Sequence, residues 1–113
     1  MNATFVELPA FASRRSAYFD DDAFRELQRS LMEQPHAGDV IQGTGGLRKL
    51  RFGDGRRGKG KRGGLRIIYF HWQEGAQFWL FTLYDKGEVA DLTQAQRRAL
   101  RDLVKTETSR RSA

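Results

Sequence analysis

Residues 65–84 read LRIIYFHWQEGAQFWLFTLY, and this stretch decides the fold class of the chain. Leu65 to Trp72 and Gln77 to Tyr84 are rich in aromatic and β-branched residues, which predicts two strands. The four residues between them, Gln73 to Ala76, suit a hairpin turn. We therefore expect an antiparallel hairpin that forms part of a small sheet.

A third strand precedes the hairpin and carries positive charge on one face. Over Leu47 to Phe52, Lys49 and Arg51 share one face of the predicted strand, while Leu50 and Phe52 share the other. A strand that is apolar on one side and cationic on the other presents its charge rather than hiding it. The preceding segment, Gly38 to Gly46, contains four glycines and is expected to be a loop.

The positive charge of the chain is concentrated in one segment. The 113 residues carry a net charge of +6. Arg48 to Arg66 contains nine basic residues and one acid, so this window carries +8 and the rest of the chain −2. Within it, residues 53–64 (GDGRRGKGKRGG) contain no apolar residue and predict an exposed connection between strands. This concentration of charge favours binding of a polyanionic partner. The alternative is that the segment is a solvated loop that only keeps the protein soluble.

The remaining elements are predicted from capping residues and helical spacing of apolar side chains. Near the amino terminus, a strand is predicted over Thr4 to Leu8 and a brief helix over Pro9 to Tyr18. A second helix begins at Asp20 to Asp22 and ends at Pro35. A third helix begins with the capping box Thr93 to Gln96 and runs through Val104. A polar tail follows from about residue 106. The order β-α-α-β-β-β-α predicts a single α+β domain over residues 1–113, with a small antiparallel sheet and the helices packed on one face.

Composition excludes several classes of protein. The chain has no Cys, so disulfides, Cys-ligated zinc, iron–sulfur clusters and cysteine nucleophiles are excluded. The amino terminus lacks the order of a secretory signal, and no apolar run approaches the roughly 20 residues of a membrane span. We expect a cytoplasmic domain that does not contact a membrane. Neither GxxxxGK[ST] nor a strand-linked GxGxxG occurs, which makes an NTPase improbable, and we expect no cofactor and no metal.

The basic segment has the side chains that nucleic-acid phosphates require. Lys49, Arg51 and Arg66 lie on adjacent predicted strands, and arginine offers a planar, bidentate fork to phosphate oxygens. Binding by such a patch weakens steeply with salt. Tyr84, at a strand end, is the best candidate to stack on a base, although most aromatic residues must fill the core. The further residues expected to bind RNA are Arg48, Arg56, Arg57, Lys59, Lys61 and Arg62.

Acid–base chemistry has few candidates in this sequence. Cleavage of RNA by two histidines would need His36 and His71 in one pocket, and their separation in sequence neither supports nor excludes this. The simpler interpretation is a loop residue for His36 and a partly buried or edge imidazole for His71. The run Asp20 to Asp22 is better explained as a helix start than as a metal site.

Three stretches of the sequence carry a family resemblance: GDVIQGTGGLRKLRF (38–52), GKGKRGGLRIIYF (58–70) and LYDKGEVADLT (83–93). Together they resemble the HigB-type branch of the RelE-like bacterial toxins. The resemblance covers about Asp39 to Val104, which is most of the chain. It implies a microbial-ribonuclease-like fold and the toxin of a type II toxin–antitoxin system, which cleaves translated mRNA in the ribosomal A site and so inhibits translation and growth. The implied partners are the ribosome, mRNA and a cognate HigA-like helix-turn-helix antitoxin, with operator DNA bound only through that antitoxin.

The resemblance also implies an active site of positive side chains rather than a pair of histidines. Lys49 and Arg51 match the family's basic strand pair, Arg66 the arginine after a glycine-ended loop, and Lys86 the basic residue after the last strand. The RelE branch adds a tyrosine near its carboxyl end, whereas no tyrosine follows Tyr84 here.

Physical chemistry agrees with a metal-independent endoribonuclease at these cations. Cleavage by the 2′-hydroxyl needs a base, an acid and charge stabilisation at phosphorus, and each fixed donor contributes about 2.7–4 kcal/mol in other enzymes. Crowded like charges favour a neutral amine, which makes Lys49 a candidate base. Since no strong acid–base pair is evident, we expect a poor nuclease until the ribosome positions the mRNA. Two alternatives stay open: a non-catalytic RNA- or ribosome-binding protein that uses the same patch, and a loop that binds an acidic protein.

Overall fold

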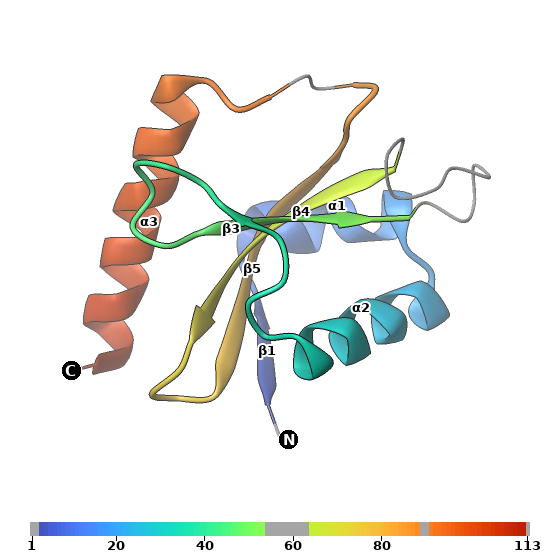
Figure 1. The fold of residues 1–113 in the computed structure, drawn as a ribbon, viewed down its shortest axis with the longest axis horizontal. Helices are drawn as coiled ribbons and strands as arrows, with labels where there is room; N and C mark the ends of the chain where they lie inside the picture. Colours follow the sequence, from blue (N-terminus) through green and yellow to red (C-terminus); the bar gives the residue numbers. More distant parts are fainter. Residues whose placement is uncertain (1–2, 54–63, 89–90, 113) are drawn as a thin grey trace.

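The computed structural model describes residues 3–53, 64–88 and 91–112 of the chain (Figure 1). The elements in chain order are β1 (Thr4–Glu7), α1 (Pro9–Tyr18), α2 (Asp21–Glu33), β2 (Asp39–Val40), β3 (Arg48–Phe52), β4 (Leu65–Trp72), β5 (Gln77–Asp85) and α3 (Gln94–Ser112). The predicted α+β class is confirmed. Within the described part of the chain, no helix combines the length and the apolar character of a membrane span.

The strands form one sheet in the order β1-β5-β4-β3-β2. The predicted hairpin is present, because β4 and β5 pair antiparallel from Leu65 opposite Asp85 to Trp72 opposite Gln77. β3 pairs antiparallel with β4, and the short β2, in a segment expected to be a loop, pairs with β3. The prediction of a purely antiparallel sheet is wrong at one edge, since β1 pairs parallel with β5. The long connection between these two strands permits parallel pairing, which a tight hairpin does not.

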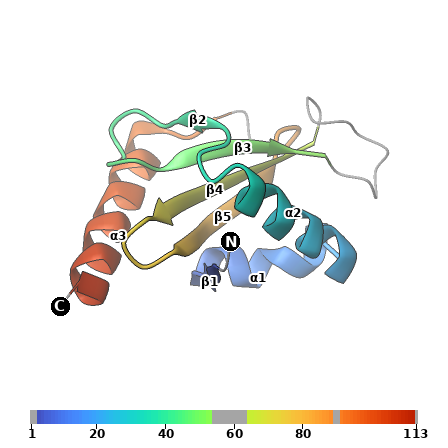
Figure 2. The same ribbon diagram turned by 60° about the horizontal axis from the view of Figure 1, so that its bottom comes forward.

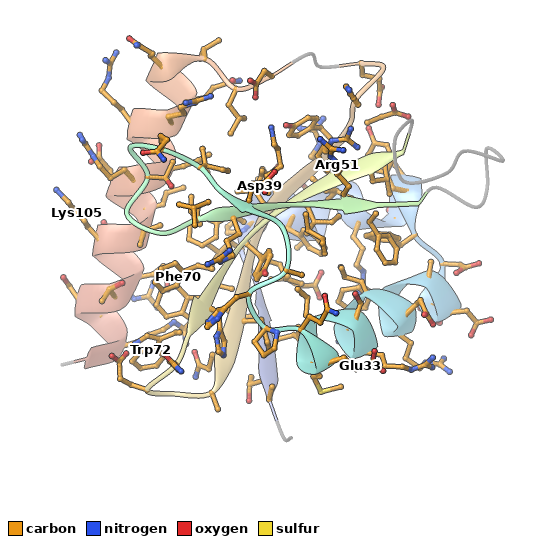
Figure 3. The ribbon with its side chains drawn as sticks, viewed as in Figure 1. Glu33, Asp39, Arg51, Phe70, Trp72 and Lys105 are labelled. Atoms are coloured by element: carbon orange, nitrogen blue, oxygen red, sulfur yellow. The ribbon has the colours of Figure 1, made fainter. Side chains whose placement is uncertain are left out.

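Helices cover both faces of the sheet, so the prediction that they share one face is also wrong. α1 and α2 pack on one face, where Phe11 and Leu27 join a cluster that includes Phe78; we call this the first cluster. α3 packs on the other face, where Leu100 and Val104 join Trp79 in the second cluster. Figure 2 shows α1 and α2 beneath the sheet with α3 standing apart from them, and Figure 3 shows Phe70 and Trp72 between β4 and α3. The physical reason is that β4 and β5 are apolar on both faces, and each face needs a covering layer.

The third helix is longer than the sequence pattern predicts. It continues through the expected polar tail to Ser112. Glu107, which is 8% exposed, pairs with Arg110 and Arg111 at 3.1 Å in each case. The Arg111 guanidinium also lies 5.5 Å from the ring centre of the buried Trp79. Ion pairs between residues three and four apart, together with this packing, extend the helix over residues whose spacing of apolar side chains is weak.

The predicted helix starts agree with the structure. Asp20 caps α2 by accepting a hydrogen bond from the Ala23 amide at 2.8 Å. At α3 the capping box forms in both directions: the Thr93 amide donates to Gln96 Oε1 at 2.8 Å, and the Gln96 amide donates to Thr93 Oγ1 at 3.1 Å. This box fixes where α3 begins, and its first turn lies beside the cations of β3.

Candidate nucleic-acid interface

The cations of β3 and β4 lie on the face of the sheet that α3 covers. Arg51 stands directly opposite Arg66 in the strand pair, and Lys49 stands opposite Ile68, a member of the second cluster. Leu50 and Phe52 pack against the first cluster on the other face, as the alternation predicted. Figure 3 shows Arg51 on β3 and Asp39 on the neighbouring β2. The structure therefore brings Lys49, Arg51 and Arg66 together on adjacent strands.

An irregularity in β5 determines which residue joins these cations. The register shifts by one residue opposite Ile68 and Tyr69, so that Tyr84 pairs with Arg66. Beyond this bulge Leu83 belongs to the first cluster and Tyr84 to the second. An extra residue in one strand exchanges the faces of the side chains that follow it. Without the bulge, the Tyr84 ring would face α1 and α2 instead of the cationic side.

Arg66 and Tyr84 are buried beneath the interface rather than spread on its surface. Arg66 is 4% exposed and donates through Nη1 to the Leu65 carbonyl at 3.2 Å. Tyr84 is also 4% exposed, so its ring faces are covered and do not form an open stacking surface. Burial raises the pKa of Tyr84 and Asp91 raises it further, while Arg66 and Arg97 oppose the shift. A neutral phenol held among charged groups is suited to positioning them.

A carboxylate that the sequence reasoning missed lies between two cations of the interface. Asp91 Oδ1 is 3.7 Å from Lys49 Nζ, and Asp91 Oδ2 is 3.7 Å from Arg97 Nη2. The hydrogen bond from the Leu92 amide lowers the pKa of Asp91, and Lys49 and Arg97 lower it further. Asp91 is therefore ionised at neutral pH, and Lys49 has an acidic neighbour as well as like-charged ones.

These three residues line a small cavity between β2, β3 and the start of α3. Its volume is about 180 Å³, and Asp39, Val40 and Leu92 complete much of its wall. Arg97 was not predicted as a site residue, because its place on the first turn of α3 gives no local signal. Only the packing of α3 against this edge of the sheet brings Arg97 beside Lys49. The cavity offers an incoming ligand the two cations Lys49 and Arg97, together with the two carboxylates Asp39 and Asp91.

Other predicted site residues occupy different places. Lys86 is exposed in the turn after β5, where its amide donates to the Gly64 carbonyl at 3.3 Å. Arg48 lies away from the cationic face, because its Nη1 donates to the His36 and Gly38 carbonyls at 3.0 and 3.1 Å. Arg48 thus holds the segment before β2. The predicted RNA-binding residues Arg56, Arg57, Lys59, Lys61 and Arg62 lie outside the described residues.

The two histidines do meet, but on the other face of the sheet. His71 Nδ1 and His36 Nε2 are 3.2 Å apart, and the His71 ring stacks on Phe78 of the first cluster at 4.6 Å between centres. Burial lowers the pKa of His71, and His36 lowers it further. The pair therefore lies apart from the cations that would hold a scissile phosphate. Over residues 3–53, 64–88 and 91–112, no group of three or more His, Asp and Glu side chains is placed to hold a metal ion.

Comparison with known proteins identifies the fold. No family model matches the chain. Among solved structures, the chain is similar to the E. coli toxin RelE in the free state, in a variant with two arginines replaced by alanine. The two share 13% identity at a TM-score of 0.51, over 80% of this chain and 90% of that one. The fold is RelE-like. This confirms the fold that the sequence resemblance implied.

Proposed function

We propose that this protein is a toxin of a type II toxin–antitoxin system, of the HigB type, that cleaves translated mRNA on the ribosome. One observation carries the proposal: Lys49, Arg51 and Arg66 stand together on one face of a RelE-like sheet. Such a cluster stabilises the charge that develops on a phosphate during cleavage by the neighbouring 2′-hydroxyl. Its natural location is the cytoplasm, where ribosomes and mRNA are available.

The proposed roles follow from where the side chains lie. Arg51, which is exposed, would contact the scissile phosphate directly, and Arg66, buried opposite it, would add positive charge from beneath. Lys49 would approach the phosphate from the cavity beside Asp91. Lys86, in the turn after β5 and beside the start of β4 that carries Arg66, would contact the same RNA. Tyr84, buried against Arg66, would position that arginine rather than stack on a base.

Dependence on the ribosome follows from what the site lacks near its cations. The two histidines lie on the opposite face, so the described residues offer no imidazole pair beside Lys49 and Arg66. Catalysis would then rest on charge stabilisation and on orientation of the RNA, and a ribosome-bound mRNA supplies that orientation. No metal is needed in this scheme. A HigA-like helix-turn-helix antitoxin would neutralise the protein and would carry it to operator DNA.

A reconstituted bacterial translation system tests this proposal. The wild-type protein should produce new 5′ ends in the translated mRNA, mapped by primer extension, and should leave the same RNA intact when ribosomes are absent. Lys49→Gln removes charge from a partly exposed position and Arg51→Gln from an exposed one. Each should lower the cleavage rate by about 100-fold or more, as loss of one charge-stabilising donor does elsewhere.

Arg25→Gln is the matched control, because it removes one exposed arginine from α2, away from the cationic face. It should cleave at the wild-type rate. If translation stops while the mRNA stays intact, the protein is a non-catalytic ribosome-binding factor instead. If Lys49→Gln and Arg51→Gln cleave like the wild type, the proposed active site is wrong.

A further inference from the structure

A cationic groove runs along α3 and continues from the cavity at Lys49 and Asp91. Three hollows of about 180, 380 and 400 Å³ lie in series between α3 and the connection from β2 to β3. Arg97 lines the first and the second, and Arg101 lines the second and the third. In Figures 1 and 2 the green connection after β2 lies beside the upper part of α3. We call these three hollows together the α3 groove.

The basic residues of the groove are regularly spaced. Arg97, Arg101 and Lys105 follow one another at intervals of four residues on one face of α3, and Arg98 adds a charge to the middle hollow. A rise of about 1.5 Å per residue places successive members about 6 Å apart along the helix. Figure 3 shows Lys105 projecting from the side of α3 away from the sheet. A straight row of cations complements a chain whose negative charges recur at short, even intervals.

Two of these arginines have unused hydrogen-bonding capacity. The Nε atoms of Arg97 and Arg101 are buried and have no hydrogen-bond partner in the described part of the chain. Arg97 uses Nη2 for the Asp91 carboxylate, and Arg101 Nε lies 4.0 Å from the Asp102 carboxylate, beyond hydrogen-bond distance. A buried donor without a partner is unfavourable, and an anionic oxygen that draws these partly exposed guanidinium groups further into the groove would satisfy it.

The opposite wall of the groove is formed by the connection between β2 and β3, which includes Gly43 and Gly45 and is tied together by Thr44. Thr44 is fully buried and ties the connection together: its Oγ1 donates to the Ile41 carbonyl at 2.6 Å and accepts from the Leu47 amide at 3.2 Å. On either side, a Cβ atom at Gly43 or Gly45 would have no neighbour within 4 Å. The wall therefore leaves open space beside α3, and Val104 is among the residues that line it.

We propose that the α3 groove binds a single RNA strand through its phosphates, as the track by which substrate enters or leaves the cleavage site. The inference rests on the proposed function, since it extends the RNA path beyond the scissile phosphate. Continuity with the cavity at Lys49, even spacing of the cations and the unpartnered Nε donors favour a phosphodiester backbone. An acidic protein segment has no comparable regularity of charge, and it is the competing outcome of the test.

The test measures the salt dependence of RNA binding with a fluorescein-labelled, 2′-O-methylated oligouridylate of about 12 nucleotides, which cannot be cleaved through its 2′ oxygens. Fluorescence anisotropy gives the dissociation constant at several salt concentrations. Each phosphate contact in a single-stranded complex contributes about 0.7 to the slope of log K against log salt. Arg101→Gln with Lys105→Gln should therefore reduce this slope by about 1.4. Arg25→Gln with Arg29→Gln removes the same charge from exposed positions of α2 and should leave the slope unchanged.

Each outcome decides the inference. A reduced slope in the α3 variant alone, with thermal unfolding like that of the wild type, supports the RNA track. Equal slopes in the wild type and the α3 variant, or no binding of the probe by the wild type at low salt, overturn it. It is also overturned if the α3 variant loses binding to a labelled polyglutamate peptide while its RNA slope is unchanged. The proposed function is judged separately, by mRNA cleavage in the translation system. If the mRNA is not cleaved but the α3 variant shows a reduced slope, the nuclease proposal is rejected and RNA binding by the α3 groove is supported.

Discussion

At the scale of single residues, Asp91 places a negative charge between two cations of the cationic face. Lys49 and Arg97 would repel each other in the cavity without it, and the carboxylate holds both at 3.7 Å. Asp91 occupies the position next to two cations that a phosphate oxygen would take. Binding of RNA must therefore displace it or accommodate it.

Asp91→Asn should tighten RNA binding. The substitution keeps the shape of the side chain and releases Lys49 and Arg97 from two exposed ion pairs, each worth about 0–1 kcal/mol. We expect the dissociation constant for the oligouridylate probe to fall by about two- to fivefold at moderate salt. Glu33→Gln, which removes an exposed acid at the end of α2, is the matched control and should have little effect. Weaker binding by Asp91→Asn would mean that the carboxylate positions the cations productively.

At the scale of elements, the segment between α2 and β3 is held by side chains from the sheet. The Tyr69 hydroxyl donates to the Ala37 and Pro35 carbonyls at 2.6 and 3.2 Å, and burial raises the pKa of Tyr69 to about 12. Arg48 bonds two further carbonyls of this segment. Because β2 follows directly and lines the cavity at Lys49, these contacts set one wall of the interface.

Gly38→Ala should destabilise the protein through this segment. Gly38 has φ +87°, and a Cβ atom there would lie 2.4 Å from the Lys49 carbonyl oxygen, which is backbone and has no room to move away. Gly43→Ala is the matched control, because φ is +78° but the space is open. In urea unfolding, Gly43→Ala should lower the free energy of unfolding by about 1–2 kcal/mol, because alanine is strained at a positive φ. Gly38→Ala should lower it by about 1–3 kcal/mol more, because the added Cβ atom overpacks the site. Equal losses would show that β2 moves away from β3 at little cost.

The start of α3 is a second element whose position bears on the interface. Thr93→Ala removes the side chain that accepts the Gln96 amide and should lower the free energy of unfolding by about 1 kcal/mol. Thr93→Ser keeps the hydroxyl and should remain within a few tenths of a kcal/mol of the wild type. Chemical denaturation monitored by circular dichroism distinguishes the two. A neutral Thr93→Ala would mean that packing of Leu100 and Val104 alone determines where α3 begins.

At the scale of the whole molecule, the sheet separates two kinds of surface. One face carries the first cluster, α1, α2 and the histidine pair, and the other carries α3, the cations and the α3 groove. The described cations of β3 and β4 are therefore not the whole of this cationic face, because Arg97, Arg101 and Lys105 of α3 extend it. These helix charges are offset in the overall sum by acids elsewhere, so the net charge conceals them.

The stability of the whole domain should depend on pH through His71. Because its pKa is lowered in the folded state, the unfolded chain takes up a proton more readily, and stability falls as pH drops below the ordinary value of 6.5. Above that value, this histidine has no further effect. Urea unfolding at a series of pH values between about 5.5 and 7.5 should show this loss in the wild type and a smaller one in His71→Phe, which keeps the stacking on Phe78. Equal losses in both proteins would exclude His71 as the source.

The agreement between sequence and structure is closest where the information is local. The alternation of β3, the hairpin of β4 and β5, and the two predicted caps depend on neighbouring residues, and all are confirmed. The bulge opposite Ile68 has no sequence signal that we recognised, and it moves Tyr84 to the cationic face. Glu107 and its arginines extend α3 through a stretch that reads as a polar tail, because their partners include Trp79 on a distant strand.

The sequence by itself determined that this chain forms an α+β domain with Lys49 and Arg51 on one face of a strand, because strand alternation assigns each side chain to a face. The pairing of β3 with β4 then placed Arg66 on that face. The tertiary structure decided that α3 covers that same face, that Asp91 lies between Lys49 and Arg97, and that the histidines meet on the opposite side. These contacts join residues far apart in the chain, and they depend on which of the three helices covers which apolar face of the sheet. No local periodicity encodes that division.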